Sequence, residues 1–210
     1  MAKNGKPDAE RLLVLARQGH KQSLGALLEM YRNYLTLVAR TQIDLHLQAR
    51  VDPSDLVQET FLEAYRDFGR FRGRYEQELM VWLRCILVHN LGSLVQKQVQ
   101  AQKRSVRRQV SLEARLAALE CSAAKMEAAL VSPWSSPSAQ AQRRQLAAVL
   151  ADQLALLPTD HRDVIVLRNL EGLSFEEVAR RMGRSSGAVR ILWMRALDRL
   201  RQLLKQEDLI

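Results

Sequence analysis

Apolar residues recur at intervals of three and four along nearly the whole chain, and strict alternation of apolar and polar residues is rare. That spacing is typical of amphipathic helices with one buried face, whereas alternation would indicate strands. The sequence therefore predicts an all-helical protein. Breaks in the pattern place the expected helices near residues 8–18, 22–44, 53–69, 77–100, 112–130, 139–156, 160–170, 175–182 and 186–205.

The expected helix after Asp52 has the clearest start. An aspartate can accept hydrogen bonds from the free backbone N–H groups of a first turn, and Pro53 suits a position where no N–H is needed. The predicted inner face consists of Val57, Phe61, Ala64 and Phe68. The other face carries Asp55, Gln58, Glu59, Leu62 and Arg66. This second face is either solvated or a docking surface.

A domain boundary is expected at residues 131–138, a run rich in Pro and Ser and free of charge, which cannot continue a helix. We predict two small helical domains, at 1–110 and 142–210, joined by a flexible linker at 111–141. Within that linker, the Ala- and Leu-rich stretch 111–130 is either a connecting helix or a helix that forms only against a partner.

Residues 174–190 have the pattern of a helix-turn-helix. Ser174 and Glu177 have capping-box spacing, and Gly183 can adopt the left-handed conformation that ends a helix. A second helix is expected to begin near Ser185 or Ser186. Its inner stripe consists of Val189, Leu192, Trp193, Ala196, Leu200 and Leu203, which leaves Gly187, Arg190, Ile191, Met194 and Arg195 on the opposite face.

That opposite face fits the major groove of DNA. Arginines can fork onto guanine edges or phosphates, and exposed Ile191 and Met194 could meet thymine methyl groups. The alternative is an amphipathic surface helix with a solvated arginine face. The capping box, the turn and the basic charge together favour DNA recognition, with Ser185, Ser186, Arg190, Ile191, Met194 and Arg195 as the contact residues.

The charge is unevenly distributed. The chain carries 32 Lys and Arg against 23 Asp and Glu, a formal net charge of +9, which favours polyanionic partners. Residues 66–110 hold ten basic and three acidic residues, and residues 180–205 hold eight basic and one acidic residue. Two separated basic blocks indicate two contacts with one polyanion, in preference to a generally solvated surface.

The first basic block also contains aromatic residues, a combination typical of proteins that hold unstacked bases beside a phosphate backbone. The alternative places Phe71 and Trp82 in the core, and for Trp82 we favour the core. The candidate nucleic-acid contacts in this block are Arg84, His89, Asn90, Lys97, Lys103, Arg104, Arg107 and Arg108.

No metal site or cofactor is expected. Cys85 and Cys121 lie far apart, and the four histidines are equally scattered, so no metal-ligand spacing occurs. No apolar stretch approaches the roughly 18 to 20 residues that span a bilayer, and residues 1–10 are polar. We therefore expect neither membrane insertion nor secretion, and a reducing, cytoplasmic setting.

Several of these motifs resemble bacterial RNA polymerase sigma factors of the extracytoplasmic-function (ECF) group of the sigma-70 family. Three segments are similar to the first conserved domain of that group: the run 52–65, the segment Arg70-Phe71-Arg72-Gly73, and Trp82-Leu83 with Ile86 and Asn90. Five further segments are similar to the second conserved domain of the group: Leu157-Pro158, the helix 164–170, Glu177-Val178-Ala179, Val189-Arg190 and Arg195-Ala196-Leu197. The two domain motifs follow each other in the order, and at the separation, that the family shows.

The resemblance implies a role for each segment. The helix at 55–66 would dock on the coiled-coil clamp of the polymerase's largest subunit, and residues 82–108 would capture and help open the minus-ten element. Residues 186–195 would read the minus-thirty-five element as duplex, while the linker threads toward the polymerase active-site channel. Core RNA polymerase and promoter DNA are the implied partners, without a small-molecule substrate, and the family also allows an anti-sigma factor.

Two positions depart from the family pattern. His89 stands where relatives often have Asn, with Asn90 one step later, and Ile191-Leu192 replaces a common Ser-Arg pair. Promoter preference therefore does not transfer from any relative.

Two other classes of function compete with this hypothesis. A regulator with a similar helix-turn-helix would bind duplex operators alone, usually as a dimer, but would need neither the 55–66 face nor the second basic block. An enzyme such as a site-specific recombinase would need a catalytic constellation around a Ser or Tyr, and the sequence offers none that is convincing.

Overall fold

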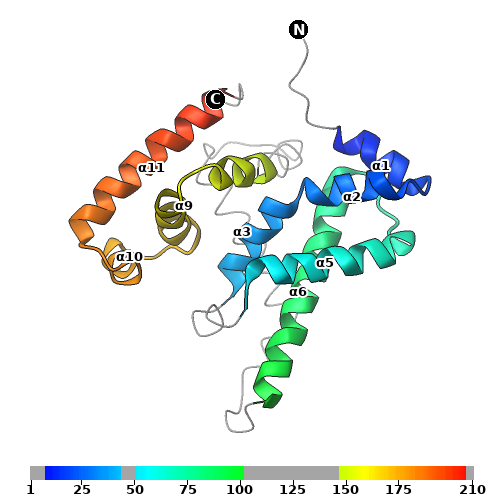
Figure 1. The fold of residues 1–210 in the computed structure, drawn as a ribbon, viewed down its shortest axis with the longest axis horizontal. Helices are drawn as coiled ribbons and strands as arrows, with labels where there is room; N and C mark the ends of the chain where they lie inside the picture. Colours follow the sequence, from blue (N-terminus) through cyan, green and yellow to red (C-terminus); the bar gives the residue numbers. More distant parts are fainter. Residues whose placement is uncertain (1–7, 44–50, 102–146, 207–210) are drawn as a thin grey trace, which may run out of the picture. The chain divides into compact units, whose positions relative to one another are not determined.

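The structure of the chain is a computed structural model that describes residues 8–43, 51–101 and 147–206. Every regular element within these ranges is helical, so the expected all-helical fold is confirmed (Figure 1). The chain divides into two compact units, with the division between Leu119 and Glu120. The predicted linker bounds at 111 and 141 and the predicted helix at 112–130 lie outside the described residues.

The first unit is built from α1 to α6. Its elements are α1 (Ala9–Arg17), α2 (Lys21–Glu29), α3 (Arg32–Gln42), α5 (Pro53–Asp67), the short 3₁₀ helix η1 (Phe68–Arg70) and α6 (Glu76–Ala101). Helix α1 packs on α2, and α5 packs on α3 and runs across α6 (Figure 1). The most deeply buried apolar side chains include Leu13, Leu27, Leu35, Val57, Leu79, Leu83 and Leu87.

Helix α5 begins as its sequence predicts. The Asp52 carboxylate accepts a hydrogen bond of 2.8 Å from the Ser54 backbone N–H, and Pro53 occupies the first turn. The expected inner face of Val57, Phe61, Ala64 and Phe68 is buried throughout. This arrangement leaves the opposite face of α5 free for solvent or a partner.

The helix expected over 22–44 is instead two helices, α2 and α3, joined at Met30 and Tyr31. Tyr31 leaves the helical conformation with φ −100° and ψ 2°, and its N–H reaches back three residues to the Leu28 carbonyl at 3.0 Å. No Gly or Pro marks this break. The turn carries the Tyr31 ring into the core, where its hydroxyl donates to Glu76, so a tertiary contact overrides a continuous helical pattern.

The second unit contains a helix at 147–155, α9 (Thr159–Ile165), the π-helical turn η2 (Val166–Leu170), α10 (Phe175–Met182) and α11 (Ser186–Gln206). The expected helix 160–170 therefore changes from α-helical to π-helical at its end, where the Glu171 N–H donates a hydrogen bond of 3.0 Å to the Val166 carbonyl, five residues back. Helix α11 packs on α9 and α10 around Leu154, Val164, Val178, Val189 and Ala196. None of the helices described in either unit has the length and apolar character needed to cross a membrane.

Candidate nucleic-acid interface and docking face

The turn between α10 and α11 is fixed by backbone capping at both ends of α10. Ser174 and Glu177 form the predicted capping box, with the Glu177 N–H 3.2 Å from Ser174 Oγ and the Ser174 N–H 2.8 Å from Glu177 Oε2. The donated Ser174 N–H lowers the pKa of Glu177, which keeps this carboxylate charged. At the other end, Gly183 takes the left-handed conformation with φ 64°. The predicted helix-turn-helix is confirmed.

The predicted recognition face is exposed on α11. Val189 and Ala196 are fully buried, and Leu200 is nearly so. Ile191 and Met194 are 48% and 54% exposed, values that no core role explains. Arg190 and Arg195 are exposed beside them. The four side chains therefore share one accessible surface.

The two serines at the start of α11 are engaged within the motif. Ser185 is exposed and its hydroxyl accepts from the Ala188 N–H at 3.2 Å, so it caps α11. Ser186 is half-buried and its hydroxyl donates to Glu176 Oε1 at 3.3 Å. Both lie at the helix N-terminus, where the positive end of the helix dipole favours an anion.

Two residues of α10 that the sequence did not single out contact Arg190. Its Nη2 lies 3.5 Å from Glu176 Oε1, and its guanidinium carbon lies 5.1 Å from the centre of the Phe175 ring. An acidic residue in a first turn is already explained by the helix dipole, so the sequence carried no separate signal for this contact.

The candidate docking face on α5 is exposed as expected at Asp55, Gln58, Glu59, Leu62 and Arg66. Leu62 is 67% exposed, and Tyr65 on the same helix is 42% exposed. The face therefore combines two large apolar groups with charges of both signs, a composition suited to protein contact.

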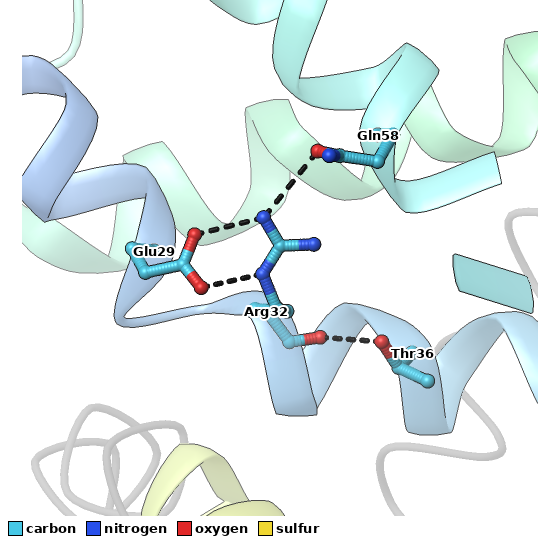
Figure 2. A network of polar contacts seen from close by, with 4 residues as sticks. All are labelled: Glu29, Arg32, Thr36 and Gln58. Atoms are coloured by element: carbon cyan, nitrogen blue, oxygen red, sulfur yellow. Dashed lines mark hydrogen bonds and ion pairs between the residues drawn. The ribbon is translucent and has the colours of Figure 1, made fainter. Parts of the chain in front are cut away.

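Gln58 is tied to the neighbouring helices by Arg32, another residue that the sequence did not single out (Figure 2). Arg32 Nη2 donates to Gln58 Oε1 at 3.3 Å and to Glu29 Oε2 at 2.8 Å. Its guanidinium also lies 5.0 Å from the centre of the Phe61 ring, and its carbonyl accepts from the Thr36 hydroxyl at 2.8 Å. The α2–α3 corner thus borders the α5 face.

The structure corrects one of the predicted DNA contacts. Arg84 is only 8% exposed, because α6 is buried over much of its circumference, including Leu83, Leu87 and Val88. The expectation that Arg84 faces DNA is therefore wrong. His89 is exposed, whereas Asn90 is half-buried, and its enclosed Nδ2 has no hydrogen-bond partner among the residues that the structure describes.

The remaining candidates of this block are not described by the structure. Lys97 lies on α6, but its side chain is outside the described set, and Lys103, Arg104, Arg107 and Arg108 lie outside the described residues altogether. Their assignment remains a prediction from the sequence.

Trp82 belongs to an aromatic cluster. Its ring centre lies 5.1 Å from that of Phe71 and 6.2 Å from that of Phe68. Phe68 and Phe71 are buried and Trp82 is half-buried, as the core interpretation expected. Gly73 packs directly against this cluster and leaves no room for a side chain, since a Cβ there would lie 2.3 Å from the Phe71 ring.

In the parts of the chain that the structure describes, no group of three or more His, Cys, Asp or Glu side chains could hold a metal ion. The accessible features are instead an arginine-bearing helix face on one unit and a mixed apolar and charged helix face on the other. Together they define a helical protein with a helix-turn-helix and a separate candidate docking face.

Comparison with known proteins assigns this architecture to a family. The family model described as "Sigma-70, region 4" matches residues 154–202. RNA polymerase sigma factor CarQ of Myxococcus xanthus is 35% identical over 157 residues, covering 74% of this chain and 76% of that protein. ECF RNA polymerase sigma-E factor of Haemophilus influenzae is 27% identical over 190 residues, covering 90% and 91%.

A solved structure, CnrH in complex with the cytosolic domain of CnrY, matches with 25% identity over 95% of this chain and 99% of that chain. The TM-score of this match is 0.35. By its sequence relatives, this chain belongs to the extracytoplasmic-function group of the sigma-70 family of RNA polymerase sigma factors.

Proposed function

We propose that the chain binds core RNA polymerase through the exposed face of α5 and directs transcription initiation at promoters that it recognises through two DNA-contacting surfaces. The observation that carries this proposal is the exposed set Arg190, Ile191, Met194 and Arg195 on α11, within the segment matched by the sigma-70 region 4 model. In this role the chain supplies specificity, and the polymerase supplies the chemistry, so the chain itself is not an enzyme. It acts in the cytoplasm.

The second unit contains the domain expected at 142–210, and this domain reads the upstream promoter element as duplex DNA. Helix α11 enters the major groove, where Arg190 or Arg195 can donate to a guanine edge and Ile191 and Met194 contact thymine methyl groups. Ser185 and Ser186 position the helix N-terminus against a phosphate.

The first unit, with the domain at 1–110, has two tasks. Asp55, Gln58, Glu59, Leu62 and Arg66 dock on the polymerase. On α6, His89, Asn90 and Lys97 contact the minus-ten element, and the following basic segment with Lys103, Arg104, Arg107 and Arg108 adds affinity for phosphates.

The test is reconstitution of the full chain with purified core RNA polymerase. We expect the two to copurify, and the complex to start transcription at a defined set of promoters that core polymerase alone does not use, identified by sequencing the 5′ ends of the transcripts. Specific duplex binding by the chain alone, without association with polymerase, would instead favour an independent regulator and overturn the proposal.

A further inference from the structure

We propose that Phe175 and Glu176 are positioning residues that hold the Arg190 guanidinium in place for one base of the upstream duplex. This inference rests on the proposed function and deepens it. It assigns part of the sequence preference to α10, a helix whose side chains would not themselves need to reach a base. Arg190 would be the residue that touches DNA.

The ion pair with Glu176 and the ring contact with Phe175 restrain the Arg190 guanidinium in different ways. Glu176 Oε1 lies 3.5 Å from Arg190 Nη2, and the guanidinium carbon lies over the Phe175 ring, 5.1 Å from the ring centre. A carboxylate fixes one edge of the planar group and an aromatic ring favours stacking against its face. An exposed arginine held in this way loses less rotamer freedom when it binds a base.

The Phe175 ring is itself fixed. It packs against Trp193 with the ring centres 5.6 Å apart and the planes at 78°, and Trp193 Nε1 donates to Asn169 Oδ1 at 2.8 Å. Arg168 also lies over the ring, at 4.6 Å, and its Nη1 donates to the Leu173 carbonyl at 2.7 Å. Phe175 thus contacts side chains from both the π-helical turn and α11.

Glu176 is also oriented by more than its ion pair. The same oxygen that faces Arg190 accepts a hydrogen bond from Ser186 Oγ at 3.3 Å. Its own backbone N–H at the start of α10, followed by Ser186 and Arg190, lowers the pKa of this carboxylate, which therefore stays anionic at neutral pH. The position of the charge is set by groups on both helices.

An anionic side chain at this place has a cost in DNA affinity. Glu176 sits on the motif that faces a polyanion, so its charge repels every duplex regardless of sequence. Such a charge is explained if it restrains the arginine, because specificity can be gained at the expense of general affinity. Arg195 is exposed on the same face, and no ion pair joins it to any residue that the structure describes.

The experiment is a selection of promoter fragments from a pool with randomised upstream duplex, using the full chain bound to core RNA polymerase. Sequencing of the bound fragments gives the base preference at every upstream position. The Arg190→Ala variant identifies the position that Arg190 reads, where the preference should fall by about tenfold, the discrimination given by one well-placed arginine–guanine pair.

Glu176→Gln and Phe175→Leu should each lower the preference at that same position, severalfold, and leave the other positions unchanged. Phe175→Tyr keeps the ring and should retain the wild-type preference. Glu176→Gln should also bind all duplexes more tightly, because a repulsive charge is removed. Asp198→Asn on α11 removes an equally exposed carboxylate, one that pairs with Arg201 at 3.3 Å, and is the matched control without an effect on base preference.

Each other outcome decides against the inference or against its foundation. Tighter binding of Glu176→Gln to all sequences with an unchanged preference would make Glu176 a repulsive charge only. Loss of preference spread evenly over all positions would indicate a structural role for α10. Either result would overturn the inference while leaving the proposed function standing, whereas a wild-type complex that enriches no upstream sequence would overturn the proposed function itself.

Discussion

The Tyr31 hydroxyl donates a hydrogen bond of 2.8 Å to Glu76 Oε1 inside the first unit, across 45 residues of sequence. The two side chains are only 1% and 7% exposed. They join the turn between α2 and α3 to the first residue of α6, so one buried polar contact connects three helices. Burial, and then the charge of Glu76, raise the pKa of Tyr31 well above its usual range.

We predict that Tyr31→Phe lowers the free energy of unfolding of the first unit by about 1–3 kcal/mol, since a buried acceptor loses a donor. Urea titration of the full chain, with hydrogen exchange of the α3 and α6 peptides, measures the effect. Tyr65→Phe, at an exposed tyrosine on α5, is the control and should change stability little.

The same pair predicts a dependence on alkaline pH. An unfolded tyrosine ionises near pH 10, while folded Tyr31 keeps its proton there, so its stabilising contribution is complete below about pH 10 and falls as the pH rises further. The stability difference between the wild type and Tyr31→Phe should therefore be constant near neutrality and shrink above about pH 10. A difference that stays constant to pH 11 would contradict this.

Gly73→Ala should destabilise the first unit by about 1–3 kcal/mol, the usual effect of overpacking. A Cβ at this position would lie 2.3 Å from the Phe71 ring and 2.8 Å from the Glu78 Cβ. Gly69→Ala is the matched control, because a Cβ there meets no atom of the described residues within 4 Å. Thermal unfolding of the two variants should separate them clearly, and equal midpoints would show that the aromatic cluster can shift to accept a methyl group.

Gly183→Ala should loosen the helix-turn-helix by about 1–2 kcal/mol, because an L-residue resists the left-handed conformation at φ 64°. Hydrogen exchange of the α10 peptide reports the local loss. Gly187→Ala lies in a helix with open space around it and should be neutral or slightly stabilising. Faster exchange of α10 in both variants would remove the conformational explanation.

Glu59→Arg should weaken binding to core RNA polymerase by at least about tenfold, since a like charge at a complementary interface is strongly unfavourable. The fold should be unaffected, because Glu59 is exposed on α5. A fluorescence titration against core polymerase measures the affinity, with Glu10→Arg on α1 as a charge-matched control. Unchanged affinity would remove α5 as the docking element.

Arg32→Lys tests whether the α2–α3 corner supports that face. Lysine keeps the charge but cannot fork between Glu29 and Gln58, so we expect weaker polymerase binding in this variant and in Gln58→Ala, without an additive loss in the double variant. Additive losses would show that Arg32 does not act through Gln58.

Features set by neighbouring residues could be predicted from the sequence. The Asp52 cap, the Ser174 and Glu177 box and the left-handed Gly183 each depend on contacts within one turn, and all three are present. Features set by contacts between residues far apart in the sequence could not be predicted. The break at Tyr31 depends on Glu76, and the burial of Arg84 depends on how much of α6 is covered by other helices. The helical spacing of apolar residues alone indicates neither the break at Tyr31 nor the burial of Arg84.

The candidate site divides in the same way. The exposed faces of α5 and α11 follow from the period of their buried positions, and the structure exposes the expected residues. The contacts from Arg32 to Gln58 and from Glu176 to Arg190 join different helices, with separations of 26 and 14 positions, and no pattern within one helix predicts them.

The division of labour along α11 has an evolutionary consequence. Val189, Ala196 and Leu200 hold the helix in the second unit, while Ile191 and Met194 stand free of the core. Substitutions at the exposed positions therefore meet little selection for stability, and under the proposed function they change mainly which DNA sequence this face recognises. Duplicated copies of such a gene could diverge in target by a few changes on this one face, each passing through intermediates that still fold.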